Sequence, residues 1–143
     1  MKTIIAGSRT ITDFATLTAA IRESGFEITE VVSGGARGAD ALGEKWAKLN
    51  DVPVGRFPAD WDTYGRKAGM IRNREMAEYG EALVALWDGK SKGTAHMIRL
   101  ARKSGLSVFV HRIPQEDNHP AMEIRAAGII RNFCLGRFNP CRE

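Results

Sequence analysis

The sequence predicts an α/β fold: a single three-layer domain with a mostly parallel five-stranded sheet, followed by a C-terminal extension. Short apolar segments typical of strands alternate with longer segments whose apolar residues recur at helical spacing. This order requires crossover connections, which place helices on both faces of a parallel sheet. The segment Ala82–Trp87 is almost purely apolar, as expected of a strand buried on both faces.

Five strands are expected, at Lys2–Ala6, Ile28–Ser33, Pro53–Phe57, Ala82–Trp87 and Leu106–Val110. The first helix is expected to begin after a cap at Thr12 or Asp13 and to run to about Ser24, where Gly25 ends it. The remaining helices are expected at Ala39–Leu49, Ala68–Tyr79 and Thr94–Lys103.

Apolar residues mark the buried faces of the first two helices. They are Phe14, Leu17, Ala20 and Ile21 in the first, and Leu42, Trp46 and Leu49 in the second. The segment from Pro58 to Gly65 reads as a polar loop that carries two aromatic residues. Residues 1–112 form the predicted domain. Residues 113–143 form the extension, in which 121–134 fits either a docking helix or a pair of strands.

Composition indicates a soluble, cytoplasmic protein. The 143 residues suffice for one core, and no apolar run is long enough to span a membrane or serve as a signal peptide. Cys134 and Cys141 form neither a CxxC pair nor a disulfide framework, and with His111 and His119 they lack metal-ligand spacing, so no metal site is expected. The net charge of +4 suits an anionic ligand. It is weak evidence for nucleic-acid binding, because the sequence has no run of five or more basic residues.

Two glycine-rich turns follow predicted strands and precede predicted helices. The first is Ser33-Gly34-Gly35-Ala36-Arg37-Gly38-Ala39-Asp40, and the second is Asp88-Gly89-Lys90-Ser91-Lys92-Gly93-Thr94. Glycines let backbone N–H groups approach a ligand, and a helix N-terminus favours negative charge. Neither turn has P-loop or dinucleotide-fingerprint spacing. Together with Gly7-Ser8-Arg9 they would meet at the carboxyl edge of the sheet, where such folds bind ligands, so a nucleotide-like ligand is predicted.

The aspartates near these turns have two interpretations each. Asp40 fits best a structural role, either capping the following helix or bonding the turn amides. Asp60 and Asp62 flank Trp61. Either a carboxylate and the aromatic ring bind a ribose and a base, or the aspartates form an Asx-turn while Trp61 packs in the core. Asp88 is placed either to bind a ribose hydroxyl or to cap the following helix. His96 is expected on a helix surface.

The sequence resembles the SLOG superfamily, and within it the small YspA-like branch, over roughly residues 2–111. The resemblance rests on motifs taken in order: Gly7-Ser8-Arg9, Ser33 to Asp40, Phe57-Pro58-Ala59-Asp60-Trp61, Arg72-Asn73-Arg74-Glu75-Met76 and Gly93-Thr94. It implies a Rossmann-like fold, an association with nucleotides or nucleotide-derived signals, frequent phage or mobile-element origin, and pairing as a homodimer or higher homo-oligomer.

One position departs from the related phosphoribohydrolases, whose Pro-Gly-Gly-x-Gly-Thr-x-x-Glu turn supplies a glutamate for glycosidic cleavage. Met97 stands in that place and cannot transfer a proton. Arg72 matches the arginine that partners the glutamate in those enzymes. Arg72 and Arg74 point about 200° apart on a helix, so only one can face the site, and the match favours Arg72.

The predicted ligand-binding residues are Gly7, Ser8, Arg9, Ser33, Gly34, Gly35, Arg37, Asp60, Trp61, Arg72, Asn73, Asp88, Gly89, Ser91, Gly93 and Thr94. Binding of a phosphorylated nucleotide or nucleotide-derived signal, as a sensor or sequestering protein without a cofactor, is favoured over enzymatic activity. The enzyme alternative is a nucleotide N-glycosidase or phosphoribohydrolase that uses Asp60, Asp62 or Glu75 as acid or base. A second alternative is single-stranded nucleic-acid binding. No membrane partner is expected.

Overall fold

The computed structural model describes residues 1–114. The chain divides into two units, Met1–Ile113 and Pro114–Glu143. Apart from Ile113 and Pro114, the predicted C-terminal extension lies outside the described residues, and so do both interpretations of 121–134. Among the described helices, none has the length and apolar character required to cross a membrane.

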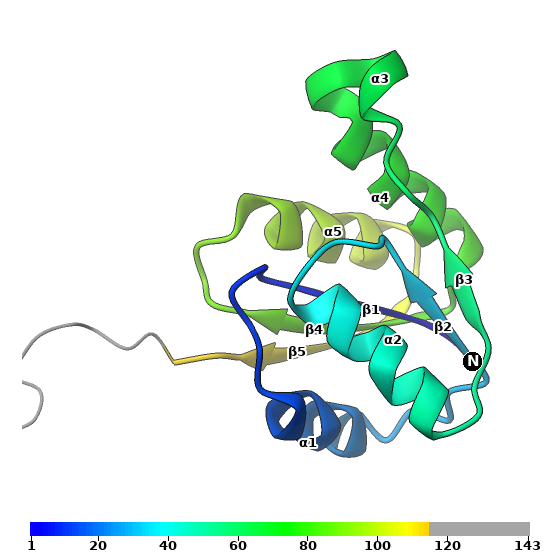
Figure 1. Ribbon diagram of the computed structural model, residues 1–143, viewed down its shortest axis with the longest axis vertical. Helices are drawn as coiled ribbons and strands as arrows, with labels where there is room; N and C mark the ends of the chain where they lie inside the picture. Colours follow the sequence, from blue (N-terminus) through cyan, green and yellow to red (C-terminus); the bar gives the residue numbers. More distant parts are fainter. Residues whose placement is uncertain (115–143) are drawn as a thin grey trace, which may run out of the picture. The chain divides into compact units, whose positions relative to one another are not determined.

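The first unit is built on a five-stranded sheet in the order β3-β2-β1-β4-β5, with every neighbouring pair parallel (Figure 1). Its strands are β1 (Lys2–Gly7), β2 (Glu30–Ser33), β3 (Val54–Arg56), β4 (Ala82–Trp87) and β5 (Ser107–Arg112). The predicted parallel α/β sheet is confirmed. The strand order changes direction at β1, because β2 lies on one side of it and β4 on the other.

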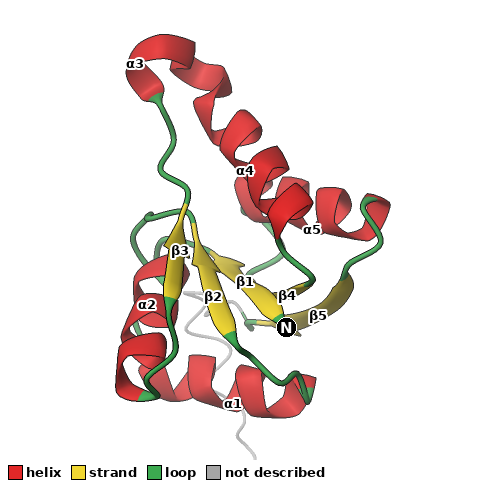
Figure 2. Cartoon of the chain, turned by 90° about the vertical axis from the view of Figure 1, so that its right-hand side faces the viewer, coloured by secondary structure: helices red, strands yellow, loops and turns green. Residues whose placement is uncertain are grey.

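Helices cover both faces of this sheet (Figure 2). They are α1 (Phe14–Ser24), α2 (Ala39–Leu49), α3 (Trp61–Tyr64), α4 (Ala68–Tyr79) and α5 (Lys92–Lys103), with the 3-10 turn η1 (Gly65–Lys67) between α3 and α4. The helices α1 and α2 lie on one face, and α4 and α5 lie on the other. Asp13 caps α1 by accepting a hydrogen bond from Ala15 N at 3.0 Å, and Gly25 ends it in the left-handed conformation.

Successive side chains of the strands pack alternately into two separate apolar cores, one on each face of the sheet. Ile4 of β1 packs with Val32, Leu83 and Met97 on the α4–α5 face. Its neighbour Ile5 packs with residues of α1 and α2 on the other face. This alternation follows from the two-residue period of a strand. All of Ala82–Leu86 is buried, so β4 is covered on both faces as its composition predicts.

Apart from shifts of one or two residues in the bounds of several elements, the structure differs from the sequence-based expectations at two places. The segment Pro58–Gly65, predicted as a loop, contains α3 and the start of η1, because the Asp60 carboxylate caps the turn by accepting from Thr63 N at 3.1 Å. Leu49, predicted on the buried face of α2, is 64% exposed. It is the last residue of its helix, and Val52 of the following turn packs against the core instead.

Candidate functional site

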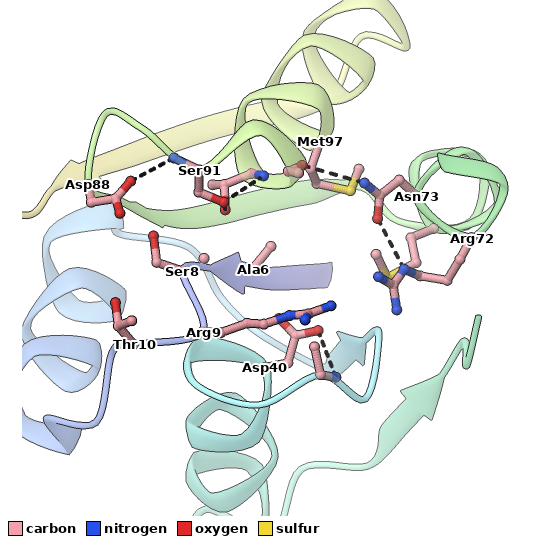
Figure 3. Close-up of a pocket in the computed structure, with 15 residues that line it drawn as sticks. Ala6, Ser8, Arg9, Thr10, Asp40, Arg72, Asn73, Asp88, Ser91 and Met97 are labelled. Carbon is pink, nitrogen blue, oxygen red and sulfur yellow. Dashed lines mark hydrogen bonds between the residues drawn. The ribbon is translucent and has the colours of Figure 1, made fainter. Parts of the chain in front are cut away.

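The turns after β1, β2 and β4 meet at the carboxyl edge of the sheet, because parallel strands end there together. Backbone hydrogen bonds join them: Ser8 N donates to Leu86 O at 3.2 Å, and Ala39 N donates to Ser8 O at 3.4 Å. A pocket of about 420 Å³ opens above these turns, and we call it the edge pocket (Figure 3). It is lined by Ala6, Gly7, Ser8, Arg9, Thr10, Ala36, Asp40, Arg72, Asn73, Met76, Asp88, Ser91, Gly93, Thr94 and Met97.

The first glycine turn holds groups of the protein itself where the sequence predicts a ligand. The Asp40 carboxylate accepts from Ala36 N at 3.3 Å, and Arg72 Nη1 donates to Gly34 O at 2.6 Å. A Cβ atom on Gly34 would collide with the Arg72 guanidinium and lie 2.9 Å from Asp40 Oδ2. The glycine is therefore needed for the close approach of these two side chains. Gly38 is the N-cap residue of α2, so Asp40 bonds the turn and does not cap the helix.

Asp40 is an unusual carboxyl group because it is buried at the edge of a polar pocket. Burial raises the pKa of Asp40 to about 6, against the opposing effects of the Ala36 amide and the Arg72 charge. Burial likewise lowers the pKa of Arg72, while Asp40 raises it. The two side chains thus form a coupled pair in which the cation partly offsets the cost of burying the anion.

The second glycine turn, in contrast, is open toward the edge pocket. Asp88 Oδ1 accepts from both Lys90 N and Ser91 N at 2.8 Å, and Ser91 Oγ caps α5 by accepting from Thr94 N at 3.4 Å. The first four N–H groups of a helix lack intrahelical partners. These bonds leave the amides of Lys92 and Gly93 without a partner within residues 1–114. A Cβ atom on Gly93 would meet nothing within 4 Å, so ligand can approach this helix end.

Ser8 places a buried hydroxyl beside that helix end. The residue is 4% exposed and lines the edge pocket, and its buried Oγ atom makes no well-formed hydrogen bond in the described part of the chain. It lies on the Asp88 side of the pocket, and the hydroxyl is near enough to that carboxylate to help lower the pKa of Asp88. The amides of Ser91 and Lys90 hold the pKa of Asp88 below its usual range. A buried polar group without a well-formed hydrogen bond is rare and costly, which makes the Ser8 hydroxyl a candidate contact for a ligand.

The helix α4 supplies the remaining polar wall. Arg72 is half-buried and faces the pocket, whereas Arg74 is exposed, as the helix geometry predicts for a pair two residues apart. Buried Asn73 accepts from Arg72 Nε at 3.1 Å, and its amide reaches Gly93 O at 3.5 Å and His96 Nδ1 at 3.3 Å. Asn73 therefore orients Arg72 and ties α4 to the first turn of α5.

Met97 forms an apolar wall in the position that the resemblance assigns to a glutamate. It is 1% exposed and lines the edge pocket together with Met76. A buried thioether has no proton to donate and binds no proton at neutral pH. The edge pocket therefore combines an anion-ready helix end with an apolar wall at this position.

Several predicted site residues lie away from the edge pocket. Gly34, Gly35, Arg37 and Trp61 line a neighbouring pocket of about 320 Å³. Ser33 is buried and bonds Glu44 Oε2 at 2.6 Å. Gly89 packs against Arg112. Asp60, Asp62 and Glu75 line neither pocket: Asp60 caps α3, and the other two are exposed.

The edge pocket also includes residues that the sequence did not single out. They are Ala6, Thr10, Ala36 and Met76. Small and apolar residues carry no chemical signal, and only the meeting of the turns reveals them. Asp40 was predicted in a structural role, and its position in the first turn of a helix after a glycine turn is the signal that could have placed it at the pocket.

Comparison with known proteins agrees with the class that the fold and pocket define, an α/β domain with a polar pocket at the carboxyl edge of its sheet. Residues 1–64 match the model of the YspA, cpYpsA-related SLOG family. The Gene 61 protein of Mycobacterium phage D29 is 37% identical over 119 residues, spanning 76% of this chain and 94% of the phage protein. No solved structure matches the chain at a significant level. The chain belongs to the YspA, cpYpsA-related SLOG family, and this membership suggests nucleotide-related binding or processing.

Proposed function

We propose that this protein binds a phosphorylated nucleotide or nucleotide-derived signalling molecule in the edge pocket, as a sensor or sequestering protein. One observation carries the proposal: the buried Ser8 hydroxyl, which makes no well-formed hydrogen bond, lies beside the open N-terminus of α5. Both supply hydrogen-bond donors to the same space, as a phosphate group requires. Membership of a nucleotide-associated family supports the same class of ligand.

The remaining groups of the pocket suit the rest of a nucleotide. Arg9 and Arg72 supply positive charge next to the helix end. Asp88 and Asp40 supply carboxylate acceptors for ribose hydroxyls. The volume of about 420 Å³ falls in the range of roughly 300–1,000 Å³ that is typical of small-molecule sites.

Gly93 gives the sharpest test, because a side chain there points into open space without backbone strain. We expect Gly93→Val to abolish binding of nucleoside phosphates in calorimetry while the protein stays folded. Ala41→Val is the matched control, since this exposed residue lies in the first turn of α2 and lines neither the edge pocket nor the pockets beside it. Unchanged affinity in folded Gly93→Val would exclude the edge pocket as the phosphate site. Native mass spectrometry of protein purified from cells would weigh a retained ligand directly.

A second candidate function is a nucleotide N-glycosidase, favoured by two carboxyl groups in the edge pocket. Asp40 and Asp88 lie on different sides of it (Figure 3). Burial raises the pKa of Asp40 to about 6, and backbone amides lower the pKa of Asp88. Opposite shifts of this kind suit a general acid and an ionised partner. Release of free base from nucleoside monophosphates, lost in Asp40→Asn, would support this candidate over simple binding.

A further inference from the structure

A third pocket adjoins the edge pocket and is strongly basic. It has a volume of about 370 Å³, and we call it the basic groove. Its cationic side chains are Arg9, Arg66, Arg72, Lys92 and Arg99, and no carboxylate lines it. Arg9 and Arg72 also line the edge pocket, so the two pockets share a wall.

Arg72 lies near the Asp40 carboxylate, whereas the other four cations have no acidic partner in the described residues. Over residues 1–114, the ion pairs are Arg56 with Glu44 and His111 with Glu23, and neither involves a cation of the groove. Burial, together with the charges of Arg99 and Arg74, lowers the pKa of His96, which also lines the groove. Like charges gathered around one hollow repel one another unless an anion joins them. The groove therefore fits an anionic group.

An exposed aromatic ring forms one wall of the same groove. Trp61 is 53% exposed, and a Cβ atom on Gly69 would lie 3.5 Å from its ring, so the ring rests over the first turn of α4. Met70 beside it is 52% exposed. The short helix α3 holds Trp61 at the outer end of α4, away from the sheet (Figure 1). An exposed indole next to cations is a platform on which a nucleobase can stack.

We propose that the ligand carries at least two phosphate groups: one at the N-terminus of α5, a second in the basic groove, and a nucleobase against Trp61. This inference rests on the proposed function and narrows its ligand class to a nucleotide with two or more phosphates. A single-stranded nucleic acid also presents phosphate groups attached to nucleosides. The test therefore compares free nucleotides with a single strand.

The test compares binding of AMP, ADP, ATP and a ten-nucleotide single strand by calorimetry. We expect affinity of the wild type to rise about tenfold or more from AMP to ATP, since each added phosphate gains charge-assisted hydrogen bonds. The triple variant Arg66→Ala, Lys92→Ala, Arg99→Ala should bind AMP like the wild type and lose this gain. The matched control is Arg22→Ala, Lys48→Ala, Arg102→Ala, which removes the same charge from exposed positions outside both pockets.

Inorganic tripolyphosphate separates the roles of charge and ring. It should lose affinity in the triple variant and keep it in Trp61→Ala, whereas ATP should lose affinity in both. The inference would be wrong if the triple variant still bound ATP more tightly than AMP by the wild-type factor. It would also be wrong if the control variant lost this difference in affinity. A single strand that binds more tightly than ATP through the same three cations would overturn the inference as well. If the wild type binds AMP but gains nothing from added phosphates, only this inference is wrong. If it binds none of these compounds, the proposed function is wrong as well.

Discussion

At the scale of single residues, the pair Asp40 and Arg72 decides what the first glycine turn does. The carboxylate takes the turn amide that a ligand phosphate would use, and the guanidinium bonds Gly34 O. A ligand bound as proposed would use the remaining donors of Arg72 and the free amides of α5. The electrostatics of the pocket therefore depend on whether Asp40 is ionised.

Arg72 and Arg74 provide a matched pair of substitutions on one helix. A hydrogen bond to a charged group contributes about 1.5–3 kcal/mol, so Arg72→Ala should weaken nucleotide binding roughly 10- to 150-fold in calorimetry. Arg74→Ala should change the affinity much less, because Arg74 is exposed and lines neither pocket. Equal losses in the two variants would show that Arg72 does not contact the ligand.

Asp40 makes stability depend on pH in a predictable direction. Its pKa rises from 3.8 to about 6 on folding, so the folded state binds the proton more tightly than the unfolded chain. Stability contributed by this group is full at low pH and falls as the pH rises from about 4 to above 6, by up to about 3 kcal/mol. The unfolding free energy of Asp40→Asn should lack this component, as urea denaturation at several pH values would reveal. Parallel pH profiles for the wild type and the variant would contradict the assignment.

At the scale of elements, the turn after β1 and the N-terminus of α2 pack against each other through a glycine. Gly38 has φ +78°, and a Cβ atom there would collide with Ser8 O and lie 2.6 Å from Arg9 Cα. This contact fixes the position of Ser8 and Arg9 in the edge pocket. Two helix ends are therefore built differently: α2 is closed by the protein's own groups, and α5 is left open.

Gly38→Ala should destabilise the protein more than Gly25→Ala. Both glycines have positive φ, which costs an alanine roughly 1 kcal/mol, but only Gly38 also meets backbone atoms, whereas Gly25 has nothing within 4 Å. We expect an additional loss on the order of 1–3 kcal/mol for Gly38→Ala in urea denaturation. Equal losses would mean that the turn moves aside without cost.

At the scale of the whole molecule, the candidate site combines two adjoining pockets with an apolar wall at Met97. The binding groups come from both sides of the switch at β1, where the strand order changes direction. Parallel α/β sheets bind ligands at such a point because the turns on either side diverge and leave a crevice. The same architecture serves binding and catalysis, so the chemistry of the lining residues must distinguish them.

We expect little or no turnover of nucleotides. General acid–base catalysis contributes about 10²- to 10⁴-fold to a rate, and Met97 cannot provide it. Incubation with a panel of nucleoside monophosphates, followed by chromatography of free base, should show none in multiple-turnover amounts. Base release that disappears in Asp40→Asn, with Glu75→Gln as an exposed control, would instead establish the glycosidase.

The sequence by itself determined the elements and their order. The helices Ala39–Leu49 and Ala68–Tyr79 and the strand Ala82–Trp87 were predicted with their observed bounds, because caps, apolar spacing and flanking turns are local signals. The orientation of Arg72 relative to Arg74 also followed from helix geometry alone. From these elements came the parallel sheet and the meeting of three turns at its carboxyl edge.

Only the tertiary structure decided which glycine turn is open and which side chains surround it. Asp40 fills the first turn by accepting from Ala36 N, and its charge is partly offset by Arg72, which is 32 positions away in the sequence. Asp60 and Glu75 carry the right chemistry but lie outside the edge pocket, while the buried hydroxyl of Ser8 is left without a well-formed hydrogen bond. Such outcomes depend on packing between distant segments. Local spacing and composition do not depend on that packing. They therefore cannot show whether the amides of a glycine turn are bonded by the protein's own side chains or are free for a ligand.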